Sequence, residues 1–335
     1  WNIFFYIFHG PAMVFLNGWF IKKENLDTRF AARKLLYYIT LYLIAKGLYY
    51  GAFLLADGEL PIWTMRSLWG ELAAPWYMLS LAEWYLLIVV FKKSNQVALL
   101  VATCLTAIGA GFVPQIGGML SLSRTIVFFP AFYLGHIVSK EKLLRRNVSR
   151  RNMSGIYFSL WFVVLLMTAA LITTKMPQYY GVLINILYGN CDYSSALMAS
   201  SIEETVPAML GCAVLRLCGL ILAFVCVAIF LISIPFDKKT GGNLWRALSH
   251  VGENSLAVYI VHFPILLFLW RYALGGLPEG IKCFTAIVIG ILTAFLLSFS
   301  GLEIVLRKLQ AMCNRVTDSL LKCAVSMKNW HRRIK

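Results

Sequence analysis

The chain has 335 residues, of which 60% are hydrophobic and 14% are charged, and its net charge is +16. A soluble domain carries about 25% charged residues and needs a largely polar surface, so this composition excludes a soluble globular fold. The positive charge does not indicate nucleic-acid binding, because the basic residues stand in short runs between apolar stretches, as in the cytoplasmic loops of membrane proteins.

Nine apolar segments predict membrane-spanning helices, each of which needs about 20 residues. In chain order they are 2–21, 33–55, 72–91, 96–113, 118–138, 153–173, 207–235, 252–273 and 281–305. The fourth and fifth segments are separated by a few residues that include Gly117 and Gly118, which predicts a tight turn. The predicted fold is an all-α integral membrane protein, a bundle of about nine transmembrane helices.

The loops between these segments alternate in charge. One set holds 24 of the 31 Lys and Arg residues and the alternate set only four. By the positive-inside rule, 22–32, 92–95, 139–152, 236–251 and 306–335 face the cytoplasm. We therefore expect a multi-pass protein of the cell membrane with a cytoplasmic C-terminus and residue 1 outside. A further helix before Trp1 would bring the total to ten.

The sequence predicts a transmembrane domain, a C-terminal tail and one long outer loop. Residues 1–305 form the predicted transmembrane domain, and 306–335 a basic tail that reads as an amphipathic helix on the inner leaflet. The outer loop 174–206 is aromatic and polar, and it is either a lid over the acceptor or a solvated connector. The eight cysteines include no CxxC pair, so the sequence supports neither a disulfide framework nor a metal site.

Ionisable side chains inside predicted spans cost about 2.5–3.5 kcal/mol each, so they indicate function or internal pairing. They are His9, Lys46, Glu83, Arg124, Arg216 and His262. One polar pocket lined by several helices would account for them together. The alternatives are a structural Lys46–Glu83 ion pair and an Arg216 side chain that snorkels to the interface.

The eighth span carries a local polar pattern. Ser255, Tyr259 and His262 are spaced i, i+4, i+7, so they share one face of the helix, and Asn254 precedes them. This face is polar in an otherwise apolar span and should point into the bundle. Ser255 could instead cap the start of the helix.

Three motifs resemble those of the membrane acyltransferase-3 family, notably its fucose 4-O-acetylase-like branch. Residues 8–20, FHGPAMVFLNGWF, look like the family's FHxPxxFFxSGyF signature, and 124–135 are similar to its RxxxFxPFFxxGy helix. Residues 252–262, GENSLAVYIVH, resemble its GxNSLxIYxxH helix. Trp76 and Tyr77, in the stretch Pro75–Leu79, are a weaker likeness of lWFLpaL. Together the motifs cover most of 1–305.

The resemblance implies ten helices and O-acyl transfer, most simply O-acetylation, from cytoplasmic acyl-CoA to a hydroxyl of a cell-surface or envelope polysaccharide. The family's usual catalytic His lies on a first helix that we expect upstream of Trp1. Three features depart from the pattern: Asn17 stands where Ser is common, Gly10 where Met is common, and the loop arginines are Arg29 and Arg33 and not a tight RxxR.

These residues suggest a division of roles. His9 and His262 are candidate bases, because a neutral imidazole suits proton abstraction, and Arg124 is a candidate oxyanion donor. Cations of the 22–34 and 140–151 runs would hold the phosphates of the donor acyl-CoA, with no tightly bound cofactor. The predicted substrate-binding set is Asn17, Trp76, Tyr77, Glu83, Asn254, Ser255 and Tyr259, and the predicted donor-binding set is Arg29, Arg33 and Lys34. The expected partners are acyl-CoA, a glycan and the lipid bilayer, without nucleic acid.

The rival hypothesis is a secondary transporter or polysaccharide exporter, in which the same buried His, Glu and Arg side chains would relay protons. No inverted repeat is visible in the sequence, and the three motifs favour acyl transfer.

Overall fold

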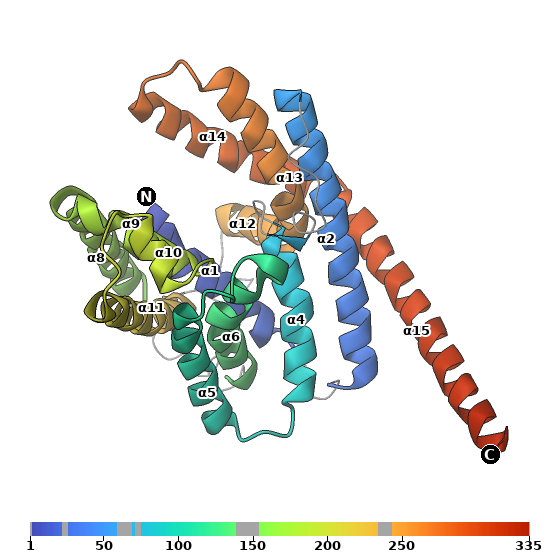
Figure 1. The fold of residues 1–335 in the computed structure, drawn as a ribbon. Helices are drawn as coiled ribbons and strands as arrows, with labels where there is room; N and C mark the ends of the chain where they lie inside the picture. The colour runs from blue at the N-terminus through green and yellow to red at the C-terminus, as the bar shows by residue number, and fades with distance from the viewer. Residues whose placement is uncertain are drawn as a thin grey trace. The chain divides into compact units, whose positions relative to one another are not determined.

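A computed structural model describes residues 2–21, 26–58, 69–70, 75–138, 154–233 and 243–334, and these are helical with short connections. The chain divides into two compact units, each built from two separate stretches of sequence. Unit 1 comprises 1–24 and 90–240, and unit 2 comprises 25–89 and 241–335. Figure 1 labels the helices of both units.

Unit 1 contains α1 (Asn2–Trp19), α5 (Gln96–Gly109), α6 (Leu122–Ile137), α8 (Ser154–Lys175), α9 (Tyr180–Tyr188), α10 (Tyr193–Met198) and α11 (Val206–Ser233). Short 3₁₀ turns η2 (Ala110–Phe112), η3 (Met119–Ser121) and η4 (Pro177–Tyr179) join some of them. Unit 2 contains α2 (Thr28–Asp57), α4 (Trp76–Val90), α12 (Asn243–Glu253), α13 (Ser255–Phe268) with the π-turn η5 (Leu269–Ala273), α14 (Glu279–Ser298) and α15 (Leu302–Ile334).

Each of the nine segments predicted to span the membrane contains a helix. Within the described residues, four helices are long and apolar enough to cross a bilayer: Thr28–Asp57, Val206–Leu231, Ser255–Ala273 and Gly280–Ser298. Three shorter apolar helices are Trp76–Val90, Gln96–Phe112 and Ser159–Thr168. The prediction of an all-α membrane protein is thus confirmed, and the number of helices that cross the bilayer stays a prediction.

Two boundaries differ from those predicted. The last span stops at Ser298, and after a break at Gly301, whose φ is +70°, the tail helix α15 begins at Leu302 and not at 306. The turn before α6 places its left-handed residues at Leu120 and Ser121, both with φ of 55°. Gly117 and Gly118 lie within the predicted turn, where their carbonyl oxygens accept from the backbone N–H groups of Ser123 and Ser121.

Helices α1 and α6 cross at two glycines that belong to the first two motifs. A Cβ atom on Gly18 would lie 1.9 Å from the carbonyl oxygen of Phe132, and one on Gly135 would lie 2.1 Å from that of Phe15. Neither position admits any side chain, because real carbon–oxygen contacts are more than an ångström longer. The two glycines therefore let the backbones of α1 and α6 touch, as small residues do between membrane helices.

Contacts inside unit 1 fix the relative directions of several helices. Gly10 lies against Phe128, and Gly18 further along α1 lies against His136 further along α6, so α1 and α6 run parallel. The Nε1–H of Trp161, near the start of α8, donates to Sγ of Cys226 at 3.2 Å, near the end of α11, so these two are antiparallel. Both relations agree with the alternating topology predicted from the loops.

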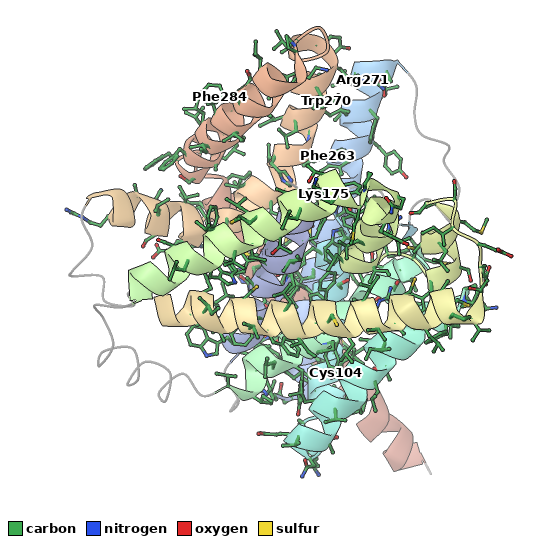
Figure 2. The ribbon with its side chains drawn as sticks, turned by 90° about the vertical axis from the view of Figure 1, so that its left-hand side faces the viewer. Cys104, Lys175, Phe263, Trp270, Arg271 and Phe284 are labelled. Carbon is green, nitrogen blue, oxygen red and sulfur yellow. The ribbon has the colours of Figure 1, made fainter. Side chains whose placement is uncertain are left out.

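Unit 2 is organised along the 30-residue helix α2. Phe263 of α13 packs on Tyr49 with ring centroids 4.6 Å apart, and Arg271 beyond it pairs with Asp57 at 2.8 Å, so α13 follows α2 in the same direction. Figure 2 labels Phe263 and Arg271 along this side of the unit. The tail helix α15 packs antiparallel to the beginning of α2 (Figure 1), where Cys313 meets Thr40.

Several basic residues behind the topology prediction lie outside the described residues, including 22–23, 139–151 and 238–239. The inside–outside orientation therefore stays a prediction, while the relative helix directions within each unit are consistent with it.

Candidate active site

An aromatic row in unit 2 joins two of the recognised motifs. The ring of Tyr77 on α4 meets Tyr259 on α13 edge to face, with centroids 5.5 Å apart. Tyr259 lies 5.7 Å from the imidazole of His262, and Trp84 lies 6.0 Å from Tyr77 on its other side. The predicted substrate residues Tyr77 and Tyr259 are thus brought together beside the predicted base His262.

The hydrogen bonds of His262 decide its tautomer. Its Nδ1 lies 2.7 Å from the carbonyl oxygen of Tyr259 and 3.2 Å from that of Val258. A carbonyl oxygen can only accept, so Nδ1 carries the proton and donates it. In the neutral ring Nε2 then holds a lone pair, which is the atom that a general base uses. The half-buried imidazole is therefore held by its own helix through Nδ1, and among the described residues Nε2 has no hydrogen-bond partner.

Asn254 and Ser255 sit at the junction of α12 and α13. Asn254 is the residue before α13 and donates its Nδ2–H to the carbonyl oxygen of His250 at 2.8 Å. His250 in turn donates Nε2–H to the carbonyl oxygen of Ser298 at 3.1 Å and stacks on Phe299. Ser255 lies inside the helix and not at its cap, so the capping interpretation is wrong. The junction is a structural brace between α12, α13 and the end of α14.

The other predicted substrate residues of the two units have mixed surroundings. Asn17, half-buried on α1, donates to the carbonyl oxygen of Met13 at 3.0 Å. Trp76 packs edge to face on Tyr77, and Glu83 lies half-buried further along the same α4. Lys46, only 2% exposed, donates its Nζ–H to the carbonyl oxygen of Gly70 at 2.8 Å. The predicted pairing of Lys46 with Glu83 stays a prediction.

Arg124 is buried in unit 1 under an aromatic ring. Its side chain is 2% exposed, and the guanidinium carbon lies 3.7 Å from the centroid of Tyr188, at the end of α9. The ring of Tyr6 on α1 closes on Tyr188 edge to face at 4.7 Å. A guanidinium stacked on a ring face at this depth is held by a contact of about 2 kcal/mol. Arg124 therefore faces the interior of its unit and not lipid.

His9 and His262 differ in their surroundings. The side chain of His9 on α1 is exposed. A small, mainly apolar cavity among α1, α6, α9 and α11 is lined by Tyr6, Phe128 and Arg216, and neither His9 nor Arg124 is among its lining residues. Because His9 and Arg124 belong to unit 1 and His262 to unit 2, their convergence in one pocket stays a prediction.

The prediction that the Arg216 side chain snorkels to the interface is wrong. This side chain is 2% exposed, stacks over Tyr193 with 4.6 Å from its Cζ to the ring centroid, and donates to the carbonyl oxygens of Cys191 at 3.2 Å and Ala107 at 3.4 Å. The free-energy cost of burying this charge is offset by these two carbonyls, which belong to the segment 177–198 and to the end of α5.

The segment 177–198, part of the loop predicted to lie outside, is folded and packed and is not a solvated connector. Tyr193, fully buried, donates its hydroxyl to the carbonyl oxygen of Ile108 at 2.8 Å and fills the space over Gly111. The hydroxyl of Ser123 donates to the carbonyl oxygen of Gly189 at 2.7 Å. The segment thus joins the adjoining ends of α5 and α6, with Arg124 held under Tyr188 and Arg216 under Tyr193.

The predicted donor-binding cations lie at the start of α2, where they already have partners. Arg29 and Arg33 both hold the carboxylate of Asp318, each through two nitrogens, at 2.7 and 2.6 Å for Arg29 and 3.0 and 2.5 Å for Arg33. Hydrogen bonds from Arg29 and then Arg33 keep the pKa of the Asp318 carboxyl well below its usual range. Lys34 lies over the ring of Tyr85, 5.1 Å from its centroid.

Three groups of residues with a clear role were missed by sequence reasoning: the glycine pair Gly18 and Gly135, the buried Tyr193, and Asp318. The two glycines lie in the recognised motifs, but the sequence alone did not show that they let α1 and α6 touch. Asp318 is the one acid among the eight basic residues of 306–335, which is a signal that it has a partner. In the described parts of both units, no cluster of three or more His, Cys, Asp or Glu could hold a metal ion.

Comparison with known proteins adds one match. A family model described as an acyltransferase domain matches residues 1–303, which is nearly the whole transmembrane region and includes all three motifs. No curated protein and no solved structure matches the chain.

Proposed function

Since the chain belongs to the acyltransferase-3 family and is a membrane acyltransferase, we propose that it moves an acyl group from cytoplasmic acyl-CoA, acetyl-CoA in particular, to a hydroxyl of a cell-surface or envelope glycan. The observation that carries this proposal within unit 2 is His262, whose Nδ1–H is donated to the carbonyl oxygen of Tyr259 so that Nε2 is left as a base. The family match favours acyl transfer over the transporter hypothesis.

The chemistry needs few groups. Nε2 of His262 takes the proton of the acceptor hydroxyl while its oxygen attacks the thioester carbonyl, and the negative charge gathers on the carbonyl oxygen. When the C–S bond breaks, the CoA thiolate leaves and takes the proton from the imidazolium, so the products are an ester and the free thiol. Tyr77 and Tyr259 suit the apolar face of a sugar ring beside this base.

The donor would enter from the start of α2. His262 is next to Phe263, which contacts Tyr49, and Tyr49 is 16 residues along α2 from Arg33, about 24 Å at 1.5 Å per residue. Arginines there would hold the phosphates, and the long pantetheine arm of CoA suits such a span between phosphate and thioester. Arg124 would stabilise the oxyanion, and His9 is a second candidate base.

The test is acetyl transfer from radiolabelled acetyl-CoA by the full-length protein in its membrane. We expect His262→Ala to lower the rate by about 10²–10⁴-fold at unchanged amounts of folded protein, because a positioned base is lost. Arg124→Lys and His9→Ala test the other two roles in the same assay.

His250 provides the matched control. Its Nε2 is committed to the carbonyl oxygen of Ser298, so His250→Gln should lower thermal stability and leave the rate per folded molecule near normal. A folded His262→Ala protein with near-normal transfer would remove His262 from the mechanism. Proton-coupled solute uptake by a full-length protein that transfers no acyl group would favour the transporter hypothesis instead.

A further inference from the structure

A carboxylate of this chain occupies the anion site at the start of α2. Asp318 of α15 receives four hydrogen bonds from Arg29 and Arg33, across 289 and 285 residues of sequence. Two guanidinium forks converging on one group form the geometry that proteins use for phosphates and carboxylates alike. The arginine side chains are 53% and 34% exposed, so a ligand from solution can reach them.

Among the described residues of the helix that supplies this carboxylate, three side chains are buried. Its buried face along α2 consists of Leu306, Cys313 and Thr317, spaced i, i+7, i+11. The neighbouring face leaves Val305, Met312, Val316 and Leu320 exposed. The two ion pairs remain accessible to solvent, so a stronger anionic ligand can compete with the carboxylate for the two arginines. The match to the acyltransferase domain ends at residue 303, so α15 lies almost wholly beyond the matched region.

We propose that Arg29 and Arg33 form a binding site for a phosphate monoester, and that Asp318 holds this site closed until the phosphate displaces it and α15 leaves α2. A phosphate monoester carries up to two charges and three acceptor oxygens, so it exceeds a carboxylate as a ligand for two guanidinium groups. This inference rests on the proposed function, in which these arginines take the phosphates of the donor. The C-terminal helix would then be an inhibitory segment that the donor itself removes.

Two native cysteines report whether α15 is docked. Cys313 is 3% exposed, with its thiol 3.9 Å from the hydroxyl of Thr40 on α2, whereas Cys323 on the same helix is exposed. Maleimide labelling of the full-length protein, read at each cysteine by peptide mass spectrometry, therefore measures undocking at Cys313 with Cys323 as the internal reference. No activity is needed for this measurement.

The first arm of the experiment removes the ion pairs of Asp318 with Arg29 and Arg33. Asp318→Asn should raise the rate of Cys313 labelling by about two- to thirty-fold, the combined effect of two exposed ion pairs. Lys322→Gln is the matched control, because it removes an exposed charge from the same helix and leaves the ion pairs of Asp318 in place, and labelling should stay at the wild-type rate. High salt should raise labelling of the wild-type protein too, and this measurement stands even if the Asp318 variant does not accumulate.

The second arm identifies the source of the phosphate. CoA is added to detergent-purified protein and compared with dephospho-CoA, which lacks the 3′-phosphate monoester. The lipid source is tested with nanodiscs of phosphatidylcholine with and without phosphatidic acid. Faster Cys313 labelling with CoA than with dephospho-CoA supports the proposal with the donor as ligand.

The remaining outcomes are also decisive. Faster labelling with phosphatidic acid alone keeps the phosphate site and removes these arginines from donor binding, so the proposed function loses its donor site while the inference stands. If CoA undocks α15 but the protein transfers no acyl group, the phosphate site stands and the proposed function is wrong. Cys313 labelling that neither phosphate monoester nor Asp318→Asn changes overturns the proposal.

Discussion

Replacing Gly18 by Ala tests the contact on which unit 1 is built. The added Cβ would lie 1.9 Å from the carbonyl oxygen and 2.9 Å from the carbonyl carbon of Phe132, and both are backbone atoms that cannot rotate away. An ordinary contact is about 3.5 Å, so α1 and α6 would have to separate by more than an ångström at their crossing.

The cost follows from what lies beside the crossing. Phe15 and Trp19, at 2% and 5% exposure, flank Gly18 on α1 and lose packing when the helices part. Overpacking usually costs about 1–3 kcal/mol, and a backbone clash belongs at the upper end. On the scale of soluble domains of similar size, this corresponds to a melting temperature lower by about 6–12 °C. Gly135→Ala should act in the same way, and the double variant should cost less than the two added together.

The assay is the thermal unfolding of the full-length protein in detergent, followed by tryptophan fluorescence and by recovery of monodisperse protein. Gly211→Ala in α11 of the same unit is the control, because nothing lies within 4 Å of its added Cβ. Removing a glycine from a helix interior should stabilise it by up to about 1 kcal/mol. The two substitutions thus have opposite expected signs, and equal melting temperatures would refute the reasoning about the crossing.

Two further predictions concern the segment 177–198 and the membrane topology. Tyr193→Phe keeps the ring over Arg216 and removes the hydrogen bond to the carbonyl oxygen of Ile108, so thermal unfolding should show a loss of about 1 kcal/mol, and an unchanged midpoint would contradict the brace. Single cysteines at positions 145 and 190 should react with impermeant reagents from opposite sides of the membrane, and labelling of both from one side would contradict the positive-inside assignment.

The sequence predicted well what depends on composition along the chain. The nine apolar segments predicted the helices because hydropathy and length alone determine where a span can form. The face shared by Ser255, Tyr259 and His262 was readable from helical spacing, and the structure places Tyr77 beside it. In these cases a local pattern carries the information.

What failed depended on partners far away in sequence. Arg216 reads as a side chain near a helix end, and only the carbonyls of Ala107 and Cys191 explain its burial. Asp318 finds Arg29 and Arg33 across most of the chain, which no local pattern can indicate. The left-handed φ of Leu120 and Ser121 was not predicted, because residues other than glycine rarely adopt it.

The interleaving of the two units sets an order for their assembly during synthesis. Helix α1 needs α6 to cover Gly18, and α6 begins 103 residues after α1 ends. At about 5–20 residues per second, α1 waits roughly 5–20 s for this partner. During that time the whole of α2 is synthesised, but α2 belongs to the other unit. Helix α1 therefore enters the bilayer before its partner α6 of the same unit, and the protein depends on lipid or on the insertion machinery to cover the Gly18 face of α1 until α6 arrives.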